Sequence, residues 1–204
     1  TERPDVVVLY LTEVDAAQHR WGTTAPELDR HLEGLAQDIR RVVARMRADG
    51  PVGISLFSDH GMTDITNHRD ILGALAAAGL ERYRDFDGFV DSTVARFWNI
   101  RRPEALRAAL DALPWGRILD EATLKRWGSW FPRGDYGDLF FLAQPGTLIL
   151  PSDMGATPIA GMHGYDPGDP TSDACFLADT EVPLPSDHIT AVLPALKQRV
   201  EERR

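Results

Sequence analysis

The sequence contains one cysteine, Cys175, among 204 residues. A lone cysteine excludes an internal disulfide framework and a structural zinc site built from several thiolates. Long apolar runs are also missing, because the longest apolar-leaning stretch, Ile71–Leu80, is about half of the roughly 20 residues that a membrane-spanning helix needs. We therefore expect no membrane span. No secretory signal pattern is visible, but the sequence does not begin with methionine, so it leaves localisation open.

Basic residues are few. The 22 Lys and Arg against 31 Asp and Glu give a formal net charge of -9. Nucleic-acid polymers are bound largely by neutralising their phosphates, so we expect no such partner. A small anionic substrate stays compatible with the acidic chain, since bound metal ions reverse the local sign of charge. The length is sufficient to bury a core and favours one domain with room for a small inserted lobe.

Apolar periodicity predicts an α/β fold with a mostly parallel sheet sandwiched by helices. Buried-type strands and helices alternate along the first part of the chain, in the order typical of parallel strands joined by crossover helices. The predicted elements are strand 6–11, helix 27–48, strand 52–57 and helix 67–78, and then, near the end, strand 174–178 and helix 186–202, which Ser186 or Asp187 would cap.

The middle of the chain has a different pattern, which predicts an inserted α+β lobe at about 84–144. Short strands and short helices follow one another there without the long crossover helices of the first part. The predicted elements are strands 92–100, 117–120 and 138–143 and helices 102–113 and 121–127. Glycine and proline are frequent from 146 to 170, so we expect a loop in that range.

Three clusters of metal-ligating residue types follow predicted strands or lie in loops. Asp15 and His19 are four residues apart, which places both side chains on one face of a helical turn. Asp59 and His60 end the second strand, where Gly61 permits a turn. His163 lies in the glycine-rich loop. Taken singly, these would be a solvated turn, a capping Asp with a surface His, and a loop His, but open α/β sheets assemble ligand sites from such strand ends.

Together, these segments resemble the alkaline phosphatase superfamily, and most closely its type I phosphodiesterase/nucleotide pyrophosphatase branch. Residues 10–22 resemble the first metal segment of that family, and Ser58–Met62 reproduces its Ser-Asp-His-Gly-Met signature. Residues 161–165 resemble its late His-Gly segment. Residues 137–146 are similar to the strand before that loop, and 174–179 to the last core strand. The similarity therefore runs in order along nearly the whole chain.

The resemblance implies two divalent metal ions, most simply zinc. Asp15, His19 and His163 would form one complete site with an open position, and Asp59 with His60 would supply half of the other. The family's nucleophile and a further Asp ligand have no counterpart here, and Thr12, Thr23 and Thr24 are misplaced for that role. We therefore expect the C-terminal part of a catalytic domain, residues 1–204, that lacks its N-terminal strands and is inactive alone.

The implied function of the parent enzyme is hydrolysis of a phosphodiester or nucleotide pyrophosphate bond by in-line displacement between two metal ions. The expected partner is a small phosphodiester or nucleotide. A chain without its first strands would also expose a sheet edge, which self-association or the N-terminal part would cover. Alternatives are a phosphonate hydrolase, a phosphomonoesterase or a sulfatase of the same superfamily, and a non-catalytic metal-binding fragment.

Overall fold

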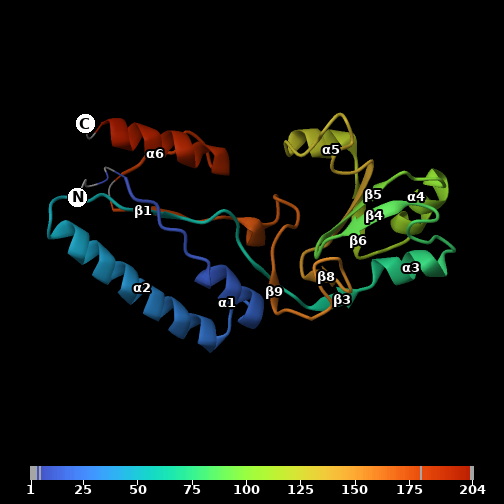
Figure 1. The fold of residues 1–204 in the computed structure, drawn as a ribbon, viewed down its shortest axis with the longest axis horizontal. Coiled ribbons are helices and arrows are strands. Elements are labelled where there is room, and N and C mark those ends of the chain that lie inside the picture. The colour runs from blue at the N-terminus through green and yellow to red at the C-terminus, as the bar shows by residue number, and fades with distance from the viewer. Residues whose placement is uncertain (1–3, 5, 180, 203–204) are drawn as a thin grey trace.

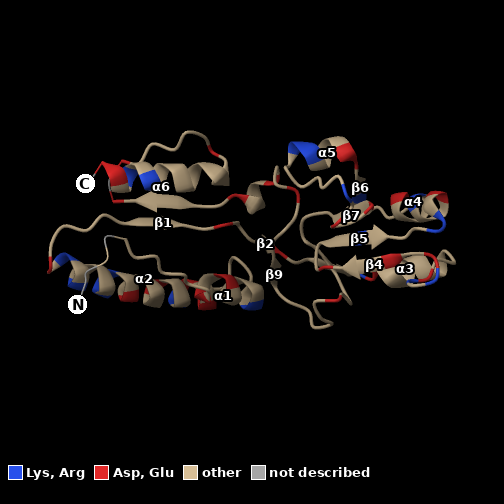
Figure 2. Ribbon diagram, turned by 45° about the horizontal axis from the view of Figure 1, so that its top comes forward, with Lys and Arg blue, Asp and Glu red and all other residues tan. Residues whose placement is uncertain are grey.

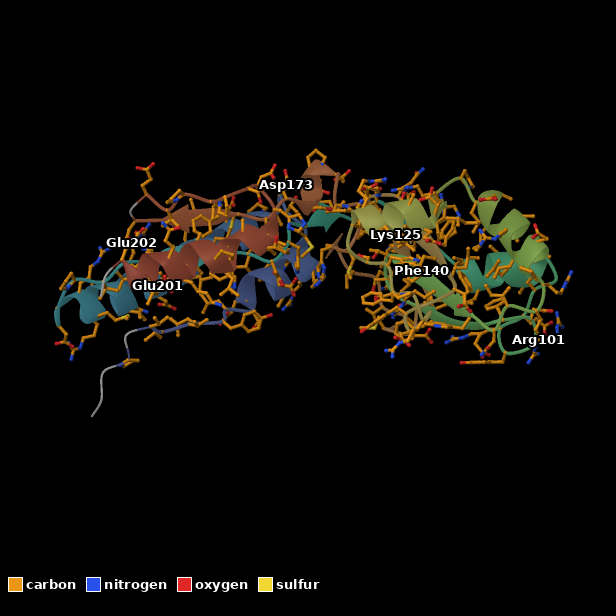
Figure 3. The ribbon with its side chains drawn as sticks, turned by 90° about the horizontal axis from the view of Figure 1, so that it is seen from above. Arg101, Lys125, Phe140, Asp173, Glu201 and Glu202 are labelled. Atoms are coloured by element: carbon orange, nitrogen blue, oxygen red, sulfur yellow. The ribbon has the colours of Figure 1, made fainter. Side chains whose placement is uncertain are left out.

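The structure, a computed structural model, describes residue 4 and residues 6–179 and 181–202. Figure 1 shows an elongated molecule with two parts that are joined by extended segments. One part holds α1, α2, β1 and α6, and the other holds strands β4 to β6 with helices α3, α4 and α5. Seen from above, Figure 3 shows the same division, with Glu201 and Glu202 in the first part and Arg101 and Phe140 in the second.

The first part is a thin assembly of helices around a short ribbon of two strands. In the ribbon, β1 pairs antiparallel with β10, so that Phe57 lies opposite Phe176. Figure 2 shows basic and acidic residues interspersed along α2. The elements are α1 (Glu13–Trp21), α2 (Pro26–Arg47), β1 (Ser55–Phe57), β10 (Phe176–Ala178), the 3-10 turn η2 (Ile189–Ala191) and α6 (Val192–Glu201).

Asp179 ties this first part together. Its carboxylate accepts a hydrogen bond from the Ile54 N–H at 2.9 Å and pairs with Arg47 at 2.7 Å and Arg199 at 2.5 Å. The Ile54 N–H makes the largest contribution to lowering the pKa of Asp179, and both guanidinium groups add to it. One carboxylate thus links the end of α2, the approach to β1, the end of β10 and α6.

The observed strands of the first part differ from the prediction. Residues 6–11 form no strand, and their apolar side chains are exposed, Val8 to 81% and Tyr10 to 84%. The second predicted strand, 52–57, shortens to β1, with Phe57 49% exposed. A strand that is buried on both faces lies in a sheet whose two faces are covered by other elements. Within the described residues, nothing pairs with 6–11 and only β10 pairs with β1.

The second part, which we call the lobe, consists of α3 (Ile71–Ala77), β4 (Asp87–Val90), β5 (Val94–Trp98), α4 (Pro103–Asp111), β6 (Gly116–Leu119), α5 (Glu121–Arg126) and β7 (Leu139–Ala143). Its sheet has the order β4-β5-β7-β6, and every neighbouring pair is antiparallel. Most of the buried core lies here, including Phe86, Phe97 and Phe141. The predicted strands and short helices of 84–144 are found within this lobe, which also includes α3, while β4, rich in Asp and Gly, was not predicted.

Short strands connect the two parts. β2 (Thr63–Asp64) pairs antiparallel with β9 (Gly161–Met162), and β3 (Asn67–Arg69) pairs in parallel with β8 (Thr147–Ile149). The predicted loop 146–170 thus contains two strands and the first residue of the 3-10 turn η1 (Pro170–Ser172). β3–β8 is the one parallel pair of strands in the described chain, so the mostly parallel sheet is not seen there. Within the lobe, the hairpin that joins β4 to β5 imposes antiparallel pairing on these two strands.

Local capping accounts for two shifted helix boundaries. The helix predicted from 67 begins as α3 at Ile71, because Asp70 caps it by accepting a hydrogen bond from the Gly73 N–H at 2.8 Å. Near the C-terminus, His188 caps η2 instead of the predicted Ser186 or Asp187, and α6 follows from Val192. Among the described residues, no helix is both long and apolar enough to span a membrane.

Candidate metal centre

Helix α1 places Asp15 and His19 on one face, as the four-residue spacing predicted. The distance from His19 Nε2 to Asp15 Oδ1 is 3.3 Å. Gly22, with φ of 79°, ends the helix and donates its N–H to the carbonyl oxygen of Gln18. The helix therefore ends two residues after His19, and the chain turns away toward α2.

Strand β9 fixes the orientation of His19. The Nδ1–H of His19 donates to the carbonyl oxygen of Gly161 at 2.8 Å, and the Ala160 N–H donates to the carbonyl oxygen of His19 at 2.8 Å. Nδ1 therefore carries a proton, and Nε2 is the ring nitrogen that faces Asp15. Backbone carbonyls hold metal-ligating histidines in this way in many metalloproteins.

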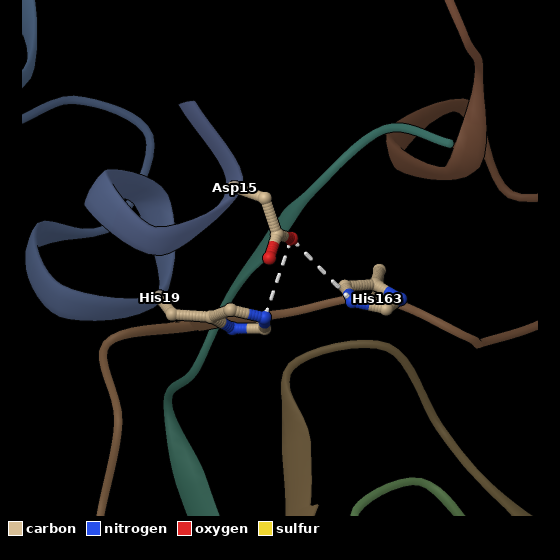
Figure 4. Close-up of side chains that lie close together, drawn as sticks. All are labelled: Asp15, His19 and His163. Carbon is tan, nitrogen blue, oxygen red and sulfur yellow. Dashed lines mark ion pairs between the residues drawn. The ribbon is translucent and has the colours of Figure 1, made fainter. Parts of the chain in front are cut away.

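His163 joins this pair from the loop that follows β9. Its Nε2 lies 3.6 Å from Asp15 Oδ1 (Figure 4). One ligand atom from each of Asp15, His19 and His163 lies within 4.8 Å of the others, and all three residues are partly buried. Asp15 Oδ1 is buried without a hydrogen-bond partner, which is costly for a carboxylate oxygen. An Asp with two histidines is a ligand set that suits a divalent transition metal ion.

The surroundings of His163 favour its neutral form. Burial lowers the pKa of the His163 imidazole from its ordinary value, and the neighbouring His60 lowers it further. The Asp15 carboxylate acts in the opposite direction without reversing the shift. Because a histidine must be deprotonated at the ligating nitrogen, a lowered pKa keeps His163 ready to bind a metal ion near neutral pH.

His60 lies against this cluster, whereas Asp59 lies at its exposed side. The His60 ring stacks on the His163 ring with a centroid distance of 3.7 Å and an interplanar angle of 16°. His60 Nδ1–H donates to the Gly61 carbonyl oxygen at 2.8 Å, and its Nε2 lies 3.4 Å from Asp59 Oδ1. The Asp59 side chain is 73% exposed. The structure thus brings all five predicted ligands into one neighbourhood, three of them around a common point.

One side-chain contact beside the site was not anticipated from the sequence. Asp64 on β2 accepts hydrogen bonds from the Thr23 N–H at 2.6 Å and the Thr23 hydroxyl at 2.8 Å. Asp64 thereby holds the end of α1 against β2 and β9. The Thr23 hydroxyl is thus used in a hydrogen bond to the Asp64 carboxylate. No sequence pattern pointed to Asp64. The one available signal was Gly22, which permits a turn directly before Thr23, the hydrogen-bond partner of Asp64.

The α/β architecture and the Asp/His cluster where strands and helices meet fit the class of metal-dependent proteins that the sequence motifs resemble. The sequence supports the same class, because residues 1–166 match the family model described as type I phosphodiesterase/nucleotide pyrophosphatase. The chain belongs to the type I phosphodiesterase/nucleotide pyrophosphatase family. This confirms the family resemblance and the α/β class of the fold, although the expected mostly parallel sheet is not seen among the described residues.

Solved structures share the fold. Murine ectonucleotide pyrophosphatase/phosphodiesterase 5 matches 80% of this chain with a TM-score of 0.65 and 20% identity, and the match covers 44% of that protein. The same murine protein was solved as an inactive variant in complex with AMP. Phosphonoacetate hydrolase from Sinorhizobium meliloti, solved with phosphonoformate, matches 90% of this chain with a TM-score of 0.64 and 17% identity. The match covers 49% of that hydrolase.

A curated relative matches a shorter stretch. Alkaline phosphatase PhoD of Zymomonas mobilis is 31% identical over 75 residues, which is 36% of this chain and 13% of that protein. The chain therefore spans less than half the length of the relatives that it matches. At these identities, the solved structures establish the shared fold, and their ligands describe only those proteins.

Proposed function

We propose that the chain is the part of a catalytic domain that hydrolyses phosphodiester or nucleotide pyrophosphate bonds with the help of divalent metal ions. The observation that carries the proposal is the convergence of Asp15, His19 and His163 around Asp15 Oδ1, a buried oxygen that accepts no hydrogen bond. Family membership supports a phosphohydrolase, and the AMP complex of the murine relative supports a nucleotide-like substrate.

In this proposal, Asp15, His19 and His163 hold one ion, most simply zinc, and Asp59 with His60 contributes to a second. Asp15 supplies negative charge, and both histidines present Nε2 toward it. The Gly161 carbonyl keeps His19 in the required tautomer. His60, stacked on His163, limits the rotation of that ring. When bound, such a pair of ions would position and polarise the phosphoryl oxygens of an in-line displacement.

We further propose that the nucleophile and the other ligands of the second site come from polypeptide outside these residues, so that the chain alone is inactive. The exposed apolar side chains of 6–10 and of β1 support a covering layer of additional polypeptide, because such a surface is unfavourable in water. That layer would be the rest of the catalytic domain or a second copy of the chain. Within the domain, the inserted lobe at 84–144 would set substrate choice.

Metal stoichiometry tests the ligand assignment. After dialysis, elemental analysis should find about one zinc per chain, as expected for one complete site. His163→Ala should lose that zinc, and His68→Ala, which changes an exposed histidine on β3, should keep it. Equal zinc in both variants would refute the assignment of His163.

Activity tests the substrate class. The polypeptide encoded by the complete reading frame should hydrolyse a nitrophenyl phosphodiester faster than a phosphomonoester, a sulfate ester or phosphonoacetate. The 204-residue chain should show no turnover with any of them. Turnover of the diester by this chain alone would overturn the proposed external nucleophile, and a preference for phosphonoacetate would reassign the reaction to the phosphonate hydrolases.

A further inference from the structure

The three residues that follow His163 each contact the lobe or the neighbouring strand β8. Gly164 accepts a hydrogen bond from the Thr93 hydroxyl at 2.9 Å, the Tyr165 hydroxyl donates to the Thr147 carbonyl at 3.0 Å, and Asp166 pairs with Arg117 at 2.5 Å. Thr93 lies in the turn between β4 and β5, Arg117 in β6, and Thr147 in the neighbouring β8.

Among these contacts, the one from Thr93 lies nearest in sequence to the ligand. Thr93 is 4% exposed, and its carbonyl oxygen accepts the Ala143 N–H at the end of β7, so the lobe sheet anchors it. Gly164 has a φ of 85°, and a Cβ there would lie 3.1 Å from Thr93 Oγ1. The Gly164 peptide therefore has little room to move. In Figure 2, the start of β5 faces β9, which agrees with this contact.

We infer that Thr93 is a positioning residue for the metal ligand His163, acting through the carbonyl of Gly164. On the other side of His163, β9 is fixed to α1, because His19 Nδ1–H donates to the Gly161 carbonyl. His163 is thus held between an attachment to α1 and an attachment to the lobe. The lobe then determines how closely the His163 imidazole approaches Asp15, in addition to any contact that it makes with substrate.

The consequence is a thermodynamic link between the lobe and the metal site. If metal binding requires the Thr93–Gly164 attachment, then bound metal must stabilise that attachment in return. Hydrogen bonds that orient a metal ligand indirectly typically change metal affinity by about 10- to 100-fold when they are removed. This inference rests on the proposed function, because it assumes that His163 binds a metal ion.

Metal titration of the chain, with Zn²⁺ for affinity and Co²⁺ for its visible spectrum, tests the inference. Thr93→Val keeps the side-chain shape, removes the donor to Gly164, and should weaken Zn²⁺ binding by about tenfold or more and alter the Co²⁺ spectrum, which reports ligand geometry. Thr93→Ser retains a hydroxyl and should restore both. Thr123→Val is the matched control, because Thr123 is a buried lobe threonine, 6% exposed, that lies in α5.

The outcomes separate this inference from the proposed function. Thr93→Val with wild-type affinity and spectrum, or Thr123→Val with an equal loss, would overturn the positioning role of Thr93. A wild-type chain that binds no Zn²⁺, or a His163→Ala chain that binds it normally, would instead overturn the metal site itself. Loss in Thr93→Val, rescue by Thr93→Ser and no change in Thr123→Val would support the inference.

Discussion

Replacing Gly161 with alanine tests whether the packing of β9 on α1 creates the metal centre. A Cβ at position 161 would lie 2.6 Å from the carbonyl oxygen of Gln18 and 3.1 Å from Met62 Cγ. Ordinary contact begins near 3.4 Å, so α1 and β9 must separate by about 0.8 Å unless Gln18 shifts. The Gln18 carbonyl belongs to helix backbone, which has little freedom to move.

A separation of this size is large for a metal site. Ligand distances in metalloproteins hold to within about 0.2 Å, and the His19–Gly161 hydrogen bond, now 2.8 Å, would lengthen beyond useful range. We expect zinc affinity to fall by at least about tenfold. Loss of the two hydrogen bonds between His19 and residues 160–161 should also destabilise the chain by about 1–3 kcal/mol.

Zinc titration with calorimetric detection measures the affinity, and thermal unfolding followed by circular dichroism measures the stability. Gly34→Ala is the control, because a Cβ at this position in α2 meets nothing within 4 Å and should stabilise the helix by about 0.5–1 kcal/mol. Wild-type zinc affinity in a folded Gly161→Ala chain would refute the argument that β9 packing sets the ligand distances.

Two further predictions concern single carboxylates. Zinc at about 100 times its Kd should raise the free energy of unfolding by about 2.7 kcal/mol, and the Tm should rise with it. In calorimetric scans, Asp15→Ala should abolish this rise in Tm. A rise in Tm that persists in Asp15→Ala would exclude Asp15 as a ligand. Asp179 has a lowered folded-state pKa, so its stabilisation is present above the unfolded value near about 3.9 and is lost as the pH falls through the folded value. Asp179→Asn should cost about 1–2 kcal/mol at pH 7 and flatten the acid limb of the unfolding curve, and parallel acid limbs would contradict this role.

The helices and the lobe strands were largely predictable because their signals are local. The long amphipathic pattern predicted 27–48, and α2 runs from Pro26 to Arg47. The predicted strands 92–100 and 138–143 located β5 and β7 to within two residues at every end. Strand 6–11 could not be judged in this way, because whether an apolar segment pairs depends on neighbours that its own sequence does not encode.

The candidate site was likewise predictable only where its signals are local in the sequence. Spacing on one helix predicted the Asp15–His19 pair, and a helix indeed aligns them at 3.3 Å. The family resemblance, rather than any local pattern, connected them with His163, which is far away in sequence. The groups that orient the ligands escaped prediction, because the partner of His19 is a backbone carbonyl, which every residue possesses.

In the isolated chain, the contacts around the candidate metal site and the exposed apolar surface lie in different places. The contacts that gather Asp15, His19 and His163 run through α1, β2, β9 and the lobe, where Thr93 and Tyr165 are buried. None of these contacts involves 6–11 or the exposed side chains of β1. The proposed metal site therefore depends on the well-packed part of the molecule, whereas the exposed apolar surface of 6–10 and β1 lies elsewhere. We therefore expect the isolated chain to bind one metal ion even if, as proposed, it does not turn over substrate.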